Sequence, residues 1–218
     1  MDTLLNLLGI LDSLLLLLLV IIIMSRWSYI NSPIKILGVF ISLSFIIQTL
    51  AIYLAEYGIN NFFLVHTLAL GEMILLSLFY YHVLDKRLKL KNLILYFIPI
   101  FSLLIILNSI FREPITGWNS TAKTFTQSVL IIYAIAYFYD LSTREILVDT
   151  KTKSLHFINS AILLYYAGSL FIFMFAKVVM KEVGTMQDVF WVFNAILYFI
   201  FCVLILIGIW RIAYSREN

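Results

Sequence analysis

The run Leu14-Leu15-Leu16-Leu17-Leu18-Leu19-Val20-Ile21-Ile22-Ile23 is apolar at every position. A half-buried strand alternates apolar and polar residues, and a helix on the surface of a soluble protein keeps one polar face. This run has no polar face, and with its flanks it reaches the length of about 20 residues that a helix needs to cross a bilayer. The sequence here predicts a membrane-spanning helix.

The whole chain shares this apolar character. Of its 218 residues, 63% are hydrophobic and 12% are charged, and the mean hydropathy is +1.02. Soluble domains carry about a quarter charged residues. A globule of 25.3 kDa has no room to hide so many apolar side chains, so we expect lipid to be the solvent. This composition excludes a soluble enzyme, a disordered chain and a nucleic-acid-binding domain.

Seven stretches are long and apolar enough to span a membrane as helices. We therefore predict an all-α integral membrane bundle of seven transmembrane helices. It forms a single domain over residues 1–218, and we expect no soluble domain. The predicted spans are approximately 4–24, 34–53, 62–83, 93–111, 122–141, 158–179 and 189–210.

The basic residues fall unequally on the two sides of these spans. Cytoplasmic loops carry the excess of Lys and Arg, so an odd number of spans predicts an N-terminus outside and a cytoplasmic C-terminus. We expect a multi-pass protein of the plasma membrane, the inner membrane of a bacterium. Eleven basic residues lie on the predicted inner side and four on the outer side: Arg26, Lys35, Lys86, Arg87, Lys89, Lys91, Arg144, Lys151, Lys153, Arg211 and Arg216, against Arg112, Lys123, Lys177 and Lys181.

Polar side chains at membrane depth gather in the outer half and the middle of the spans. An ionisable group in hydrocarbon costs several kcal/mol unless it is paired or hydrated, so each one is a candidate for function. If these groups face inward, they line a cavity that opens to the exterior and takes a small or lipidic ligand. The alternative is that they only hold helices together. The predicted ligand-binding residues are Asp12, Gln48, His66, Glu72, Tyr165, Tyr166, Asn194 and Tyr198.

The sequence predicts neither a metal site nor a cofactor. The motif H-E-x-x-H of zinc hydrolases is absent, and two of the three histidines lie at the opposite membrane face from His66. The single cysteine, Cys202, excludes a disulfide framework and a cysteine-based zinc site. Because the last span has no lysine, it offers no attachment point for retinal.

Two segments in the last third of the chain, INSAILLYYAGSLF (158–171) and WVFNAILY (191–198), suggest a family resemblance. They look like the closing helices of uncharacterised bacterial seven-helix membrane proteins. Similar seven-helix regions form the membrane sensor part of some histidine kinases. The resemblance implies a sensor role, but no functional residue carries over, and we expect no kinase region after the last span.

Three functions are consistent with these patterns. The leading hypothesis is a receptor or sensor that signals through a separate cytoplasmic partner, bound by the inner loop that includes Arg144, Lys151 and Lys153. The second is an intramembrane lipid hydrolase, although an enzyme is the less favoured class. The third is a small transporter or an accessory subunit. The catalytic residues of the hydrolase would be Asp12, Glu72 and His66, with the two carboxyl groups acting as a pair.

Overall fold

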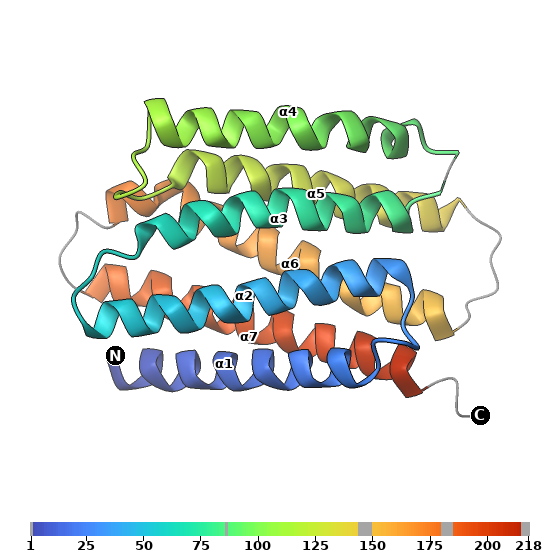
Figure 1. Ribbon diagram of the computed structural model, residues 1–218, viewed down its shortest axis with the longest axis horizontal. Coiled ribbons are helices and arrows are strands. Elements are labelled where there is room, and N and C mark those ends of the chain that lie inside the picture. Colours follow the sequence, from blue (N-terminus) through green and yellow to red (C-terminus); the bar gives the residue numbers. More distant parts are fainter. Residues whose placement is uncertain (1, 86, 144–149, 180–184, 215–218) are drawn as a thin grey trace.

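The protein is a bundle of seven long helices, seen in a computed structural model that describes residues 2–85, 87–143, 150–179 and 185–214. The helices lie side by side along the long axis of the molecule (Figure 1). Within the described residues there is no strand. The helices are α1 (Asp2–Ser25), α2 (Ser32–Glu56), α3 (Phe62–Val83), α4 (Lys89–Phe111), α5 (Ser120–Ser142), α6 (Thr150–Val179) and α7 (Thr185–Tyr214).

Each predicted span falls within one observed helix, which confirms the all-α architecture. In the described part of the chain, six helices are long and apolar enough to cross a membrane. The exception is α5, whose first half carries Ser120, Thr121, Lys123, Thr126 and Gln127. These polar residues lower its hydropathy although its length matches that of its neighbours. The architecture is therefore that of a multi-pass membrane protein.

Six of the helices form a closed ring, in the order α1, α2, α3, α5, α6, α7 and back to α1. The most polar helix, α5, belongs to this ring and buries many side chains against α3 and α6. In contrast, α4 lies at one edge of the bundle (Figure 1) and packs chiefly on α3. Its buried residues are Ile94 and Ile105. The interior of the bundle is thus built without α4.

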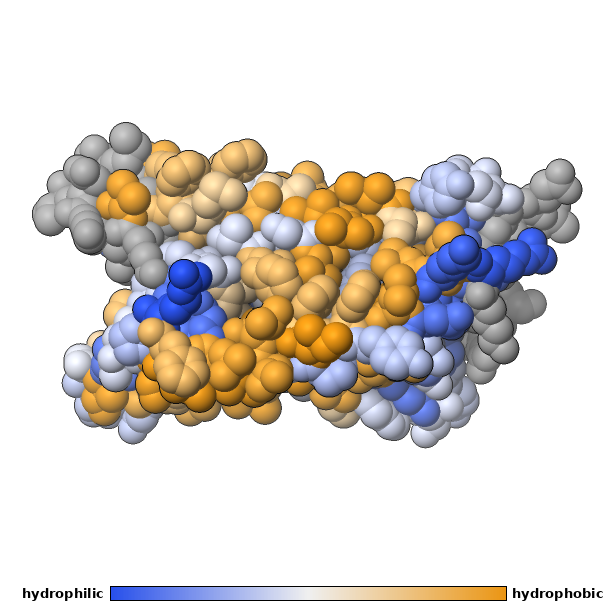
Figure 2. All heavy atoms as spheres, turned by 90° about the horizontal axis from the view of Figure 1, so that it is seen from above, coloured by the Kyte–Doolittle hydropathy of each residue, from blue (hydrophilic) through white to orange (hydrophobic). Residues whose placement is uncertain are grey.

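The outer surface has an apolar middle and hydrophilic ends. Figure 2 looks onto the side of the molecule where α4 lies and shows hydrophobic residues across the middle of that face, with hydrophilic residues gathered toward both ends. Well-exposed apolar side chains include Leu103 and Ile110 of α4 and Phe171 of α6. Exposed apolar area of this extent marks a surface that meets lipid or another protein.

The two ends of the bundle differ, and we name them by the chain terminus that each holds (Figure 1). The N-terminal end holds the start of α1 and the turn from α2 to α3, where Gly58 adopts a φ of 65° that favours glycine. The C-terminal end holds the end of α7 and the turn from α1 to α2. There the Asn31 side chain accepts a hydrogen bond from Ile34 N and caps α2, and Pro33 occupies the first turn.

Candidate functional site: a polar cavity at the N-terminal end

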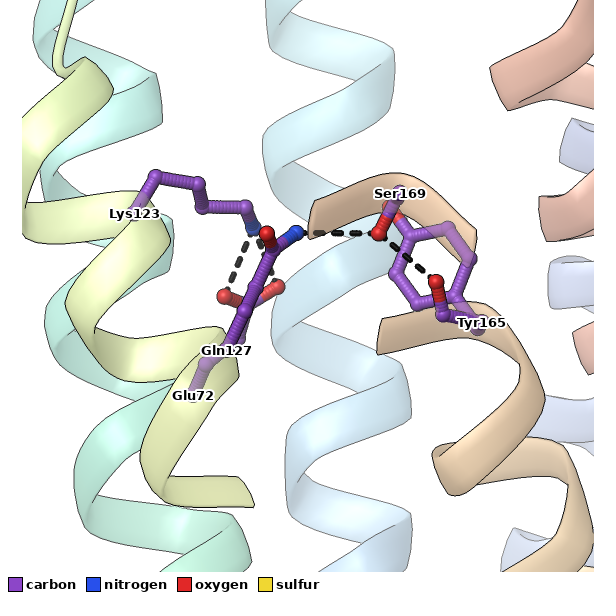
Figure 3. Close-up of polar contacts among 5 residues, drawn as sticks. All are labelled: Glu72, Lys123, Gln127, Tyr165 and Ser169. Carbon is purple, nitrogen blue, oxygen red and sulfur yellow. Dashed lines mark hydrogen bonds and ion pairs between the residues drawn. The ribbon is translucent and has the colours of Figure 1, made fainter. Parts of the chain in front are cut away.

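A buried ion pair joins α3 to α5 inside the ring. Lys123 Nζ lies 2.6 Å from both carboxylate oxygens of Glu72, and the two side chains are 2% and 3% exposed. Figure 3 shows the two groups pointing toward one another from neighbouring helices. A single buried charge would be very costly, and close pairing offsets this cost. Each residue therefore accounts for the presence of the other in the interior.

Two further contacts hold the ion pair in place. Lys123 Nζ lies 5.2 Å from the centroid of the Phe173 ring on α6, which is a cation–π distance. One helical turn after Lys123, Gln127 Nε2 donates to Ser169 Oγ at 2.9 Å, and Ser169 in turn donates to Tyr165 O at 2.7 Å (Figure 3). Lys123 and Gln127 thus connect α5 to both α3 and α6.

A cavity of about 510 Å³ opens beside the ion pair. This volume lies within the range of about 300–1,000 Å³ that is typical of small-molecule sites. The lining comes mainly from the parts of α2, α3, α5, α6 and α7 that lie toward the N-terminal end of the bundle, together with Asn61 and Trp118 in the connections. The polar and charged lining residues are Ser44, Gln48, Asn61, Glu72, Lys123, Tyr165, Tyr166, Asn194 and Tyr198, and the others are Phe40, Ile47, Ala51, Phe62, Leu64, Val65, Leu68, Trp118, Phe173, Trp191 and Phe201.

A chain of aromatic rings lies at the N-terminal end of this cavity. Trp118 contacts Phe62 and Trp191, with ring centroids 5.2 Å and 5.4 Å apart, and Trp191 approaches Phe173 at 6.4 Å. The chain therefore runs from α3 through the α4–α5 connection and α7 to α6. Edge-on aromatic contacts of this kind are favourable beyond the area they bury. The last ring of this chain, Phe173, also lies against Lys123 Nζ of the ion pair.

Several polar atoms around the cavity have no hydrogen-bond partner among the described residues. These atoms are Trp118 Nε1, Asn194 Oδ1 and, beside the ion pair, Gln127 Oε1, whereas the Tyr166 hydroxyl interacts with the Glu72 carboxylate. Tyr166 is fully buried. Buried polar groups in native proteins are nearly always hydrogen-bonded, to protein, water or ligand. The set contains both donors and acceptors, so the cavity is equipped for a ligand that also carries both.

Six of the eight predicted ligand-binding residues line this one cavity: Gln48, Glu72, Tyr165, Tyr166, Asn194 and Tyr198. Gln48 Nε2 also donates to Ser13 Oγ at 3.1 Å, which links α2 to α1. The six come from α2, α3, α6 and α7, and the closed ring turns them toward a common interior. Asp12 and His66 do not join them.

His66 instead ties α3 to α4 and to the connection after it. Its Nε2 lies 3.1 Å from the carbonyl oxygen of Gly117 and its Nδ1 lies 2.7 Å from Ser109 Oγ. A carbonyl oxygen only accepts, so Nε2 carries a proton. Both ring nitrogens are engaged in contacts within the protein, which explains the presence of His66 at this depth without a ligand.

Asp12 is buried on α1, a helix that adds no residue to the cavity in the part of the chain that the structure describes. Its Oδ1 has no hydrogen-bond partner there. Asp12 lies within electrostatic range of Tyr198 and Cys202 on α7. Glu72 pairs with a lysine rather than with a second carboxyl group, so the structure does not assemble Asp12 and Glu72 as the bare carboxylate pair of the hydrolase hypothesis.

The sequence interpretation missed Lys123, which it counted among the basic residues of the outer side. Lys123 lies in the first turn of α5 and reaches into the bundle, where it is 2% exposed. One signal was available: Glu72 near the middle of a span needs a cation, and Lys123 is the basic residue that starts another span at the same end. The identity of the neighbouring helices was needed to use that signal.

A second group of buried polar residues lies toward the C-terminal end, where direct hydrogen bonds join three helices. The Tyr80 hydroxyl on α3 donates to Asn159 Oδ1 on α6 at 2.8 Å, and Asn159 Nδ2 donates to Ala134 O on α5 at 3.1 Å. Nearby, Asp140 accepts from the backbone N–H of Asp85 at 3.1 Å. We call Tyr80, Asn159 and Ala134 the polar clamp. It joins three helices, and none of its residues lines the cavity beside the ion pair.

The predicted partner-binding residues are described only in part. Lys153 is exposed near the start of α6. Lys151 belongs to the same helix, but its side chain lies outside the described residues, as does Arg144 altogether.

Across the part of the chain that the structure describes, no group of three or more His, Cys, Asp or Glu side chains is arranged to hold a metal ion. When compared with known protein families, with characterised proteins and with solved structures, the chain matches none.

Proposed function

We propose that this chain is a seven-helix membrane receptor or sensor whose polar cavity binds a small or lipidic ligand. The observation that supports this proposal is the cavity itself. It is large enough for such a ligand, has a charged pair at its base, and is lined by polar atoms without partners. A bundle that used its polar residues only for helix association would pair them directly, as the polar clamp does.

The ligand chemistry follows from the lining. Glu72 and Lys123 neutralise each other, so the cavity has no net charge to balance a strongly charged ligand. The lining aromatic rings provide apolar contact area, whereas Tyr166 and Asn194 provide hydrogen-bonding groups. We infer an amphipathic or uncharged polar ligand that inserts its polar part toward the ion pair and leaves its apolar part against the rings.

The proposal includes a seventh span and an orientation. In a membrane α5 crosses with the other helices because it belongs to the ring and is 23 residues long. The basic residues support an extracytoplasmic N-terminal end. With Lys123 buried against Glu72, three of the four basic residues that the sequence assigns to that side are left to count in the charge comparison, against eleven assigned to the other side. The cavity then opens outward.

Signalling in this proposal is a helix rearrangement. A ligand shifts the equilibrium between two arrangements only by its difference in affinity for them. Both α5 and α6 contribute to the cavity, through Lys123 and through Tyr165, Tyr166 and Phe173. In the sequence Arg144 closely follows the end of α5, and Lys151 and Lys153 belong to the start of α6. A cytoplasmic partner bound there would sense their movement.

Thiol labelling tests whether the cavity opens to the outside. In a Cys202→Ser background, Asn194→Cys places a thiol in the cavity lining, and Leu103→Cys places one on the lipid-facing side of α4. A membrane-impermeant methanethiosulfonate reagent added to intact cells should modify Asn194→Cys and leave Leu103→Cys unmodified. Modification of Asn194→Cys only after the cells are opened would contradict the proposed orientation.

Analysis of bound molecules tests whether the cavity holds a ligand. Ala51→Trp fills the cavity, and Leu103→Trp adds the same ring to the lipid-facing surface. Molecules extracted from the purified proteins are then identified by mass spectrometry. We expect at least one molecule in the wild-type and Leu103→Trp samples that is missing from Ala51→Trp. Identical extracts from all three proteins would refute the ligand-binding role.

A further inference from the structure

A stripe of residues on the outer side of α6 changes from cationic to apolar along the helix. Lys153, Phe157, Ser160, Leu164 and Phe171 follow one another at spacings of three, four and seven residues, so they share one face. Leu164 and Phe171 are exposed, which shows that this face points out of the bundle. The stripe borders α7, the helix that α6 contacts most extensively.

The cationic part of this stripe lies toward the C-terminal end of the bundle and borders a basic hollow of about 420 Å³. Lys153, His156, Phe157 and Ser160 of α6 line it together with Arg211 of α7. The Arg211 guanidinium carbon lies 4.8 Å from the centroid of the Phe157 ring, a contact that orients the guanidinium. No acidic side chain is among the described residues that line the hollow. Its chemistry therefore suits an anion.

The hollow lies at the depth of lipid headgroups. Lys153 is the second residue of the apolar span Thr152–Phe175, and Arg211 is the second-last residue of the apolar span Gln187–Ile212. The neighbouring Trp210 is half exposed. Tryptophan and basic residues at the ends of spans mark the boundary between hydrocarbon and water. An anion bound in this hollow would thus lie at the membrane surface.

An apolar hollow continues the same α6–α7 surface toward the N-terminal end. It has a volume of about 490 Å³, and its lining includes Ala167 and Phe171 of α6 with Val189 and Phe193 of α7. Gly168 lies between the helices at this level, where a Cβ would come within 2.7 Å of Leu197. The helices therefore pack closely beneath a shallow apolar surface that is suited to an acyl chain.

We propose that the α6–α7 surface is a binding site for an anionic phospholipid. Its phosphate would bind to Lys153 and Arg211, with the Ser160 hydroxyl as a further donor, and its acyl chains would lie along the apolar hollow. A free phosphate would use the cations but not the apolar surface. This site is separate from the polar cavity and does not depend on the proposed function. In this proposal Lys153 binds a lipid, and Arg144 and Lys151 are the residues that would bind a protein partner.

Native mass spectrometry in detergent with defined lipids tests the site. Phosphatidylglycerol and phosphatidylcholine with the same acyl chains are supplied to wild-type protein and to Lys153→Gln/Arg211→Gln. We expect the wild type to retain phosphatidylglycerol in preference to phosphatidylcholine. The double variant should bind phosphatidylglycerol about 30-fold more weakly, from two charges that each act near the membrane surface.

A matched variant separates this site from general charge attraction. Arg87→Gln/Lys89→Gln removes two exposed basic residues from the same end of the bundle, at the α3–α4 connection. It should keep the wild-type preference for phosphatidylglycerol. An equal loss in both double variants, or a wild type without preference, would overturn the proposal. Displacement of phosphatidylglycerol by inorganic phosphate at millimolar concentration would assign the cations to a free anion and would also overturn it.

Discussion

The two halves of this bundle treat buried polar side chains in opposite ways. Toward the C-terminal end, Tyr80 and Asn159 form direct hydrogen bonds that join three helices. Toward the N-terminal end, Trp118 and Asn194 line a cavity, and Trp118 Nε1 and Asn194 Oδ1 have no partner among the described residues. Tyr166, which also lines the cavity, even shares one face of α6 with Asn159, seven residues apart.

This difference distinguishes polar groups that hold helices together from polar groups that are available to a ligand. A polar group that holds helices together needs a complementary group at hydrogen-bond distance, and the polar clamp supplies one for each partner. A polar group that serves a ligand has to keep its bonding capacity available in the empty protein. The stability of the bundle should therefore depend on the polar clamp and on the ion pair, and much less on the polar atoms of the cavity that lack partners.

Removal of one member of the ion pair should have the largest effect. Lys123→Gln leaves the Glu72 carboxylate buried without its cation, so we expect a loss of about 3–5 kcal/mol in the free energy of unfolding. Because Glu72→Gln/Lys123→Gln removes both charges, it should recover most of this loss. Thermal and denaturant unfolding of the purified proteins in detergent measures both. A single variant as stable as the wild type would show that the pair contributes nothing to stability.

The next largest effect should come from larger side chains, which should destabilise the closely packed helix contact more than the cavity. A Cβ at Gly208 on α7 would come within 3.0 Å of the Ser154 carbonyl oxygen and 2.7 Å of Ile158 Cγ1. Gly208→Ala should therefore cost about 1–3 kcal/mol by overpacking. Ala51→Leu adds more atoms but extends into the cavity, and we expect it to cost less than about 1 kcal/mol. Thermal and denaturant unfolding measure both costs. If Gly208→Ala and Ala51→Leu lowered the free energy of unfolding equally, the cavity would be closed in solution.

The smallest effect should come from single hydroxyl groups. Tyr80→Phe removes the donor to Asn159, and interhelical hydrogen bonds in membranes contribute about 0.6 kcal/mol on average, with a maximum of about 1.7 kcal/mol. We expect a loss in this range. Tyr166→Phe removes a hydroxyl beside the Glu72 carboxylate, which Lys123 already pairs, and should cost less than Tyr80→Phe. If Tyr166→Phe were as destabilising as Tyr80→Phe, the distinction between the polar clamp and the cavity would not hold.

The positions of the helices followed from the chain alone because hydropathy records the solvent that each segment meets. A run such as 14–23 has a single satisfactory environment, and every predicted span lies within an observed helix. The depth of each polar residue followed as well, since helical rise converts sequence position into distance along the bundle. This is why Gln48 and Asn194 were expected in the outer half and Glu72 and Tyr165 near the middle of their spans, and all four line one cavity.

The partners of those residues depended on how the helices associate. Rotation about a helix axis and the choice of neighbours decide whether a side chain faces lipid, another helix or a cavity, and neither leaves a local trace in the sequence. The ring order brings Lys123 to Glu72 across 51 residues, holds α4 outside, and directs His66 to Ser109 instead of the cavity. Contacts between helices far apart in the sequence, rather than hydropathy, therefore decided whether a polar group pairs with another helix or lines the candidate site.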